Sequence, residues 1–349
     1  MIDYITDYMT IDQDYNAFKG KETFICNKGI KNLALEVKNY ILQNYQTENL
    51  AEITNLTRIT SDFYPDLLDH RAVDWIFVLN TLNFALWNPR STKQWTVNQL
   101  TGYQALCVAI KRAIDEEIPI WSPKYYTKLT QHELEMIFKS DDGETNIPLI
   151  HERLTILHEI GNILLHKYQG SFVTCVKRSK GNPLKLLNLI VTNFESYQDK
   201  STYEKEPVYF YTKARSLVSD IWFYFKGHKF GFNYATWMKT MFIDYRFSQI
   251  LLHFKIVSYS KQHLTKLERN DELKYGSKEE IEIRSSSMAA IDSLSTEVFK
   301  MCNDYFVKKK QTDINYTIIL DNFLSDYRQV HDQLLMETQP FPNIKCVYY

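Results

Sequence analysis

Residues that reverse the direction of the chain are scarce in this sequence. Of its 349 residues only 10 are glycine and 9 are proline, where average usage would give about 24 and about 17. Long elements with few sharp turns are therefore expected, which favours a helix-rich fold over a barrel, a sandwich or a glycine-rich nucleotide-binding sheet. No internal repeat, linker or low-complexity block interrupts the chain. The sequence predicts one all-α domain over residues 1–349 with at most a short hairpin, either compact throughout or built as two helical lobes around one cleft.

Apolar residues at helical spacing place the expected helices at 33–45, 72–87, 101–114, 151–167, 184–194, 210–225 and 318–330. Residues 72–87 are apolar nearly all round, so this helix is expected to be buried. Its Asn80 and Asn83 then need hydrogen-bond partners, which are either neighbouring backbone or a ligand. Residues 261–278 are polar and are expected to be exposed, whereas 279–284 alternate in a way that fits either a short strand or the start of a helix.

The charge and the cysteines restrict the class of protein. Lys and Arg number 41 against 42 Asp and Glu, a net charge of -1, whereas proteins that grip long nucleic acid carry a strong positive excess. The odd number of scattered cysteines, 5 in all, makes a poor disulfide framework and has no metal-ligand spacing, so reduced thiols are expected. The acidic first residues resemble no signal peptide, and no apolar run could span a bilayer. We expect a cytoplasmic protein, monomeric, with no nucleic-acid or membrane partner.

Two stretches resemble metal motifs without matching them. Asp141-Asp142-Gly143 is a turn signal that lacks the spaced oxygen ligands and the terminal Glu of a calcium loop. His158-Glu159 is followed by His166, but zinc metalloproteases need the second histidine four residues after the first. The sequence therefore predicts neither a metal nor a cofactor.

Residues 241–246 place Asp244 and Arg246 two positions apart among apolar and aromatic residues, including Phe242. Burying such charges is costly unless they are paired. One interpretation is a pocket wall, which is mostly apolar with a few placed polar groups. The other is an internal Asp244–Arg246 ion pair that holds two elements together.

Residues 318–327 give a second acidic cluster. On a helix, one arc is apolar and comprises Ile319, Leu320, Phe323, Leu324, Tyr327 and Val330. The opposite arc carries Asp321, Asn322, Ser325 and Asp326. An ordinary amphipathic helix with a solvated face explains this pattern from periodicity alone. The alternative is a pocket, because a solvated face usually carries Lys or Glu whereas these polar side chains are all short.

Several stretches together resemble the queuosine salvage proteins, which act as queuosine 5′-phosphate N-glycosylases. The resemblance runs from about residue 70 to the end of the sequence. It is carried, in order, by residues 73–78, 81–84, 102–103, 113–120, 170–172, 196–199, 241–246, 280–284, 320–321, 326–327 and 346–349. Because so many separate matches fall in the same order, the resemblance is specific.

The resemblance implies a helical fold related to the helix-hairpin-helix DNA glycosylases. It also implies cleavage of the N-glycosidic bond of queuosine 5′-monophosphate, which frees the base queuine. The aromatic-x-Asp motif for the base falls on Phe242 and Asp244, the catalytic carboxylate on Asp321, and a further binding carboxylate on Asp326. Two positions depart from the family pattern and are expected to affect base binding: Ser61 stands where relatives carry His, and Asn322 where they carry Tyr.

The chemistry of this reaction fits the residue types. Carboxylates suit the donor edge of queuine and its cationic arm, and the 5′-phosphate requires Arg or Lys, for which Arg246, Lys213 and Arg215 are the candidates. Two other functions remain open. A DNA base-excision enzyme is suggested by the related fold, and a non-catalytic queuine-binding or nucleotide-binding module by the departures at Ser61 and Asn322.

Overall fold

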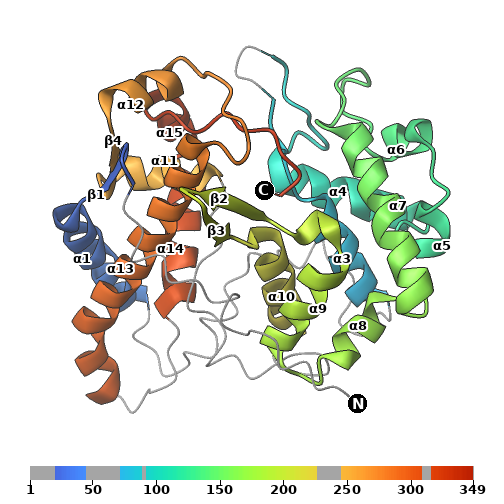
Figure 1. Ribbon diagram of the computed structural model, residues 1–349, viewed down its shortest axis with the longest axis horizontal. Coiled ribbons are helices and arrows are strands. Elements are labelled where there is room, and N and C mark those ends of the chain that lie inside the picture. The colour runs from blue at the N-terminus through green and yellow to red at the C-terminus, as the bar shows by residue number, and fades with distance from the viewer. Residues whose placement is uncertain (1–19, 45–70, 89–91, 226–244, 309–315, 349) are drawn as a thin grey trace. The chain divides into compact units, whose positions relative to one another are not determined.

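The computed structural model describes residues 20–44, 71–88, 92–225, 245–308 and 316–348, and these residues are mainly helical (Figure 1). They divide into two compact units, each described by itself. Unit 1 comprises Met1–Arg58, Ser201–Tyr209 and Tyr234–Lys345, and unit 2 comprises Ile59–Lys200, Phe210–Asn233 and Cys346–Tyr349. The organisation as a single domain around one cleft stays a prediction.

Unit 2 is helical. Its elements are α3 (Ala72–Leu82), α4 (Gly102–Asp115), α5 (Pro123–Tyr126), α6 (Gln131–Ile137), α7 (Ile150–Lys167), α8 (Phe172–Arg178), α9 (Pro183–Asn193), the 3-10 turn η4 (Glu195–Tyr197) and α10 (Thr212–Phe225). Capping residues explain where several of these helices begin. Thr130 and Glu133 form a reciprocal capping box at α6, and the Asn182 side chain caps α9 ahead of Pro183.

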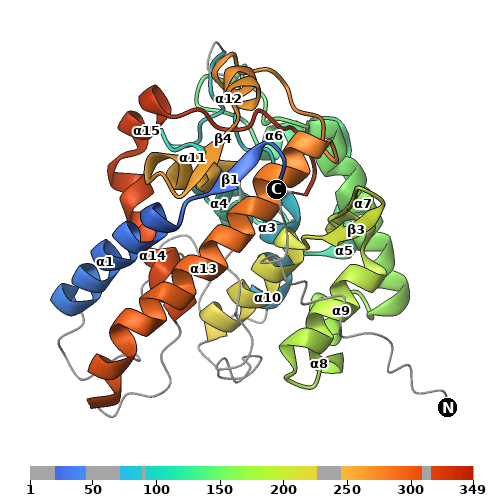
Figure 2. The ribbon, with the colours of Figure 1, turned by 60° about the vertical axis from the view of Figure 1, so that its left-hand side comes forward.

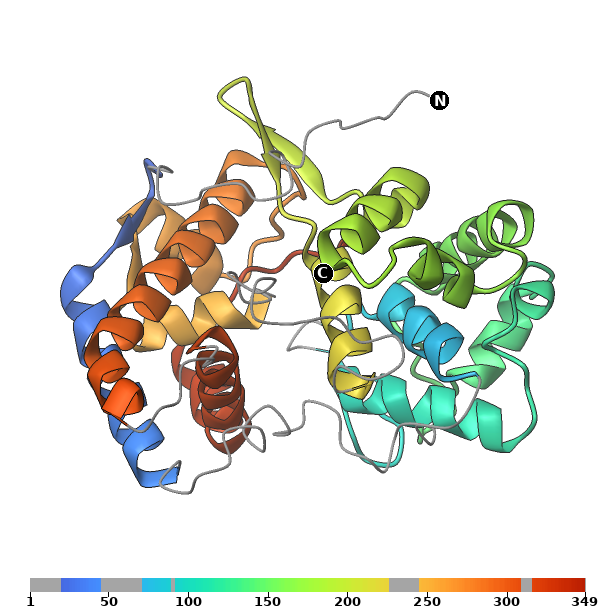
Figure 3. The same ribbon diagram turned by 90° about the horizontal axis from the view of Figure 1, so that it is seen from below.

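Helix α3 forms the centre of unit 2. Figure 3 shows it in light blue, with α10 in yellow and α4, α7 and α8 in teal to green around it. Its side chains from Trp75 to Leu82 are buried on every side, as the all-round apolar pattern predicted. The partners of Asn80 are the backbone and a carboxylate: Nδ2 donates to the Ile76 carbonyl at 3.1 Å and to Asp220 at 2.8 Å.

Two buried cations cap the C-terminal end of α3. The Arg153 guanidinium, on α7, is fully buried and donates to the carbonyls of Leu82, Phe84 and Pro148. Lys213 Nζ, on α10, donates to the carbonyl of Thr81 at 3.2 Å. The last carbonyls of a helix have no partner within the helix and carry partial negative charge, so the donors of both side chains satisfy this end.

Unit 1 contains a long helix and two small sheets. Its elements are β1 (Thr23–Ile25), α1 (Asn27–Asn44), the hairpin strands β2 (Lys200–Tyr203) and β3 (Glu206–Tyr209), α11 (Tyr245–His253), β4 (Val257–Tyr259), α12 (Lys261–Glu268), α13 (Lys278–Lys308), α14 (Tyr316–Val330) and α15 (Asp332–Thr338). Helices α1 and α13 run side by side, as Figure 2 shows in blue and orange. Strands β1 and β4 pair antiparallel, with Thr23 opposite Tyr259.

The first turns of α13 bury acidic side chains. Glu280 accepts from the Gly276 amide at 3.1 Å and pairs with Arg284 at 3.2 Å. Glu282 accepts from the Glu22 amide at 2.8 Å and from the Tyr203 hydroxyl at 2.6 Å. Buried carboxylates require such partners, and these bonds tie α13 to the segment before β1 and to the β2–β3 hairpin.

The structure confirms a mainly helical chain and corrects two details of the sequence analysis. The expectation of at most a short hairpin was wrong, because β1 and β4 form a second small sheet besides β2–β3. Of the two alternatives for residues 279–284, the start of a helix is confirmed, because these residues belong to α13. Residues 261–278 are not simply exposed, since α12 buries His263 and Leu267. Because charged and polar residues surround these two positions in the sequence, their burial was not apparent from it.

We expect Arg153→Met to lower the free energy of unfolding by about 2–4 kcal/mol. Three buried carbonyls lose their donor at about 1–3 kcal/mol each, and part of that loss is offset because a charge is no longer buried. Urea unfolding of the variant against Lys124→Met, an exposed position on α5, measures the difference. Equal stability of the two variants would show that capping by Arg153 is dispensable.

Candidate functional site

The residues predicted for the site fall on both units. Asp321, Asn322 and Asp326 lie on α14 and Arg246 on α11, all in unit 1, whereas Lys213 and Arg215 lie on α10 in unit 2. Three further predicted residues, Phe242, Asp244 and Ser61, lie outside the described residues. The two interpretations of the 241–246 segment therefore both stay open.

Helix α14 buries part of its polar arc. Asp321 is 2% exposed and Asn322 is 8% exposed, whereas Asp326 is exposed and Ser325 is half-buried. The amide nitrogen of Asn322 is buried and has no hydrogen-bond partner among the described residues. An ordinary solvated helix face does not explain buried short polar side chains at consecutive positions.

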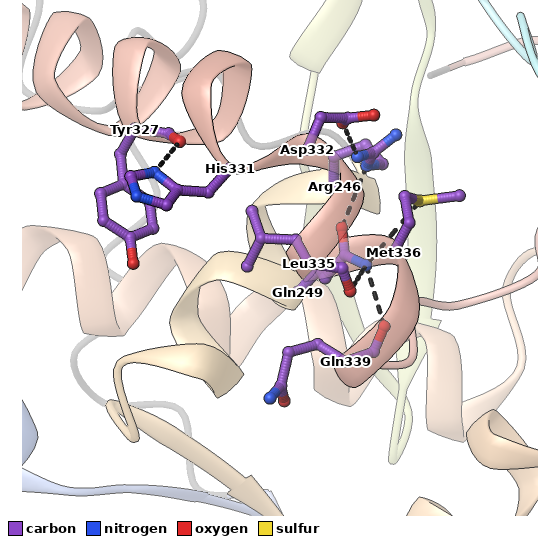
Figure 4. A network of polar contacts seen from close by, with 8 residues as sticks. All are labelled: Arg246, Gln249, Tyr327, His331, Asp332, Leu335, Met336 and Gln339. Atoms are coloured by element: carbon purple, nitrogen blue, oxygen red, sulfur yellow. Dashed lines mark hydrogen bonds and ion pairs between the residues drawn. The ribbon is translucent and has the colours of Figure 1, made fainter.

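Tyr327 anchors the C-terminal half of α14 to α11. Its hydroxyl lies 2.8 Å from His253 Nε2, and its ring centroid lies 4.7 Å from that of Phe254. The His331 ring stacks on it at 4.1 Å, and His331 Nδ1 lies 2.9 Å from the Tyr327 carbonyl (Figure 4). Burial lowers the pKa of His253, and the neighbouring His331 lowers it further. A neutral imidazole can keep its bond to the tyrosine hydroxyl.

Arg246 joins α11 to α15. Its guanidinium forms an ion pair with Asp332 and donates from Nε to Gln249 at 3.1 Å (Figure 4). The Gln249 amide in turn donates to the carbonyls of Leu335 and Gln339, both at 2.9 Å. These contacts give Arg246 a structural function, and its assignment to the phosphate stays a prediction.

Lys213 lies in a cage of carbonyls and rings within unit 2. Besides Thr81, its ammonium donates to the Val347 carbonyl at 2.9 Å, and it lies 5.1 Å from the Phe84 ring centroid and 4.9 Å from that of Tyr197. Burial lowers the pKa of Lys213 to about 7, against the opposing attraction of Glu159. Arg215, two residues on, is also buried. The surroundings of Lys213 differ from the solvated setting of a surface phosphate contact.

Sequence reasoning missed the groups that position these side chains. Arg153 lies in the first turn of α7, and a lone arginine on an amphipathic helix is usually taken for a surface residue. Tyr327 counted only as an apolar position, although His331 follows it by four residues. That spacing puts two side chains on one helix face and was the available signal.

The described part of the chain holds no group of three His, Cys, Asp or Glu side chains arranged to bind a metal ion. The two stretches that resemble metal motifs in the sequence have other contacts. His158 Nε2 lies 2.9 Å from the Leu129 carbonyl, and Asp142 accepts from the amides of Glu144 and Thr145. Among the same residues, no helix is long and apolar enough to cross a bilayer.

Comparison with known proteins gives one consistent result. The family model described as queuosine salvage protein matches residues 63–349. This chain belongs to the queuosine salvage protein family. A Bos taurus protein named queuosine 5′-phosphate N-glycosylase/hydrolase is 38% identical over 289 residues, which is 80% of this chain and 82% of the relative. Proteins of the same name from Mus musculus and Schizosaccharomyces pombe are 36% and 30% identical, over 80% and 76% of this chain and 83% and 77% of their own lengths.

The family match covers every predicted site residue except Ser61. Asp321, Asn322 and Asp326 lie within residues 63–349, as do all three candidate phosphate ligands, whereas Ser61 precedes that range. The comparison therefore gives the departure from the family at Ser61 no support.

We expect the buried ammonium of Lys213 to make stability depend on pH in the alkaline range. Its pKa is about 7 in the folded protein against the ordinary value of 10.5 for lysine, so between these pH values the unfolded chain binds more protons. Stability from this group then rises with pH by up to about 1.4 kcal/mol per unit. In Lys213→Met this rise is absent. Urea unfolding at several pH values from 7 to 10, with the exposed Lys128→Met as control, measures the difference. Parallel stability curves would contradict it.

Proposed function

We propose that this protein hydrolyses the N-glycosidic bond of queuosine 5′-monophosphate and releases queuine for reuse in tRNA modification. The observation that carries the proposal is the family match over residues 63–349. Relatives bearing the name queuosine 5′-phosphate N-glycosylase/hydrolase align over most of their own length and of this chain, which supports the same activity here.

We assign the catalytic function to Asp321. Hydrolysis at the anomeric carbon develops oxocarbenium character, which a nearby carboxylate stabilises while it activates water or attacks directly. The burial of Asp321 supports this assignment, because a low-dielectric setting strengthens the interaction of the two charges. No lysine adjoins Asp321 in the sequence to form a Schiff base, so simple hydrolysis is expected. A 7-deaza base has no N7 to protonate, so stabilisation of both fragments must come from electrostatics.

We assign base recognition to Phe242 and Asp244. The ring of Phe242 would stack on the base, as aromatic side chains do in base pockets, and the carboxylate of Asp244 would accept from its pyrimidine edge. Asp326 is exposed and, within the described part of the chain, accepts a long bond of 3.3 Å from Tyr40, which leaves oxygens for the cationic arm. Asn322 and Ser61 would adjust base affinity.

For the 5′-phosphate, Arg246, Lys213 and Arg215 remain the candidates. The net charge of -1 favours a small nucleotide over nucleic acid as substrate. We further propose that the fold is related to the helix-hairpin-helix DNA glycosylases and that the protein acts as a cytoplasmic monomer without a cofactor.

Chromatographic release of queuine from queuosine 5′-monophosphate tests the proposed activity, with guanosine monophosphate as the control substrate. We expect release from the first only, because the cationic arm and the deazaguanine edge provide the selective contacts. Lack of release together with tight binding of free queuine would replace the enzyme by a binding module. Release from both nucleotides would mean that the Ser61 and Asn322 positions have widened the pocket.

We expect Asp321→Asn to lower kcat by about a hundredfold or more, the usual consequence of losing one electrostatic stabiliser of the transition state. The substitution keeps the shape of a buried side chain, so thermal unfolding should remain close to that of the wild type. Asp304→Asn, which removes the same charge from an exposed position on α13, is the control. Full activity of Asp321→Asn would remove this carboxylate from the mechanism.

A further inference from the structure

The start of α12 buries a histidine whose ring has no hydrogen bond. His263 is 1% exposed, and neither Nδ1 nor Nε2 has a partner among the described residues. Its ring lies 5.3 Å from that of Tyr259, the last residue of β4. A neutral imidazole carries one donor and one acceptor, so the fold leaves both unsatisfied at a cost of about 1–3 kcal/mol each.

A second buried polar atom without a partner among the described residues lies on the sheet of β1 and β4. Thr23 stands opposite Tyr259 in the β1–β4 pair, and directly opposed side chains share one face of a sheet. The Thr23 hydroxyl is also buried and has no partner among the described residues. Two buried polar groups next to Tyr259, the His263 ring and the Thr23 hydroxyl, thus lack partners there, whereas the charged groups nearby are paired.

The surrounding charges are tied to one another. Ser260, which caps α12, donates its hydroxyl to the Glu22 carboxylate and its amide to the Glu22 carbonyl. Lys266 pairs with Glu279 at 2.7 Å. Glu282 accepts from the Glu22 amide, as described above. We call this set the α12 junction; it consists of Glu22, Ser260, His263, Lys266, Glu279 and Glu282.

We propose that protonation of the His263 ring opens the α12 junction. Protonation converts the ring into a buried cation with two donors, which is costly unless a carboxylate pairs with it. The charged groups that act electrostatically on the ring are Glu279 and Glu282 from α13, Glu22 before β1, and Lys266 from α12 itself. Each of the three carboxylates already holds another partner.

Neither ring nitrogen has a hydrogen-bond partner among the described residues, so the imidazolium can pair with a carboxylate only if the ring or the carboxylate moves. Glu279, Glu22 and Glu282 are held in their present positions by Lys266, the Ser260 hydroxyl and the Glu22 amide. These contacts fix α12 and the segment before β1, so a movement that brings a carboxylate to the ring strains them and loosens the junction. Opening to solvent, where imidazolium is well hydrated, has the same result.

The direction of the pH dependence follows from burial. Burial lowers the pKa of His263 below the ordinary 6.5, although the three carboxylates oppose it. The open junction thus binds a proton more readily than the closed one. Below about pH 6.5 the population of the open junction should rise by up to tenfold per pH unit, until the folded pKa is reached.

Hydrogen exchange of residues 257–269 in the full-length protein, followed from pH 7.5 to 5.0 and corrected for intrinsic rates, tests the proposal. In the wild type we expect protection to fall by up to about tenfold per pH unit below 6.5. In His263→Phe, which keeps a ring that cannot titrate, protection should not change with pH. His132→Gln, an exposed histidine on α6, should behave as the wild type. Equal pH dependence in wild type and His263→Phe would overturn the proposal.

An NMR titration of the His263 ring in the wild-type protein gives a result that does not depend on how any variant folds. A titration midpoint below pH 6.5 supports the proposal. A midpoint at or above pH 6.5 would mean that the closed junction accepts the proton, and would overturn the proposal. His263→Gln, polar but not titratable, repeats the exchange experiment should the phenylalanine disturb packing.

Discussion

The packing of unit 2 depends on hydrogen-bond donors for the backbone carbonyls at the C-terminal end of one buried helix. Helix α3 is surrounded by protein, so the carbonyls at its C-terminal end cannot bond to water. Arg153 and Lys213 supply the missing donors from α7 and α10, and both also lie against the ring of Phe84. A single aromatic ring between two cations thus joins the three helices at the point where the chain leaves α3. A guanidinium can donate to several carbonyls at once from a fixed planar fork, whereas an ammonium has fewer donors and loses its proton more easily.

Unit 1 also buries charged side chains near one end of a helix, but there the side chains are acidic. The first turns of α13 bury Glu280 and Glu282, whose oxygens accept from backbone amides, Arg284 and Tyr203. The carboxylates connect segments that are distant in sequence, including the residues before β1. His263 is a further buried group in unit 1, and Glu282 attracts it only when it is protonated. The units therefore differ in how pH affects them: unit 2 contains a buried lysine and unit 1 a buried histidine.

The sequence predicted the helices with a strong apolar stripe but missed others, and it predicted buried charges poorly, for a physical reason. Periodicity reports which side of a helix is apolar, so it located α3 and α14, although α3 ends at Leu82 rather than at residue 87. Helix α13 was predicted only as one of two alternatives for residues 279–284. It does not report which neighbours cover a polar arc, so Asp321 and Asp326 looked alike although one is buried and the other exposed. Val330 belonged to the predicted apolar arc of α14 and is 77% exposed, because it is the last residue of that helix. Arg153 binds backbone carbonyls, which have no signature in the sequence.

Helix α14 contains both Tyr327, which fixes the helix to its neighbours, and the candidate catalytic carboxylate of Asp321. Tyr327, bound to His253 and stacked on His331, fixes the C-terminal half of the helix, and Asp321 lies on a different side two turns earlier. A carboxylate that must act on a developing oxocarbenium ion needs a fixed position and little water. Rigid anchoring provides the first, and the burial of Asp321 and Asn322 provides the second. Burying an amide nitrogen without a partner destabilises the fold, and such a cost is expected where a side chain is kept for a ligand rather than for stability.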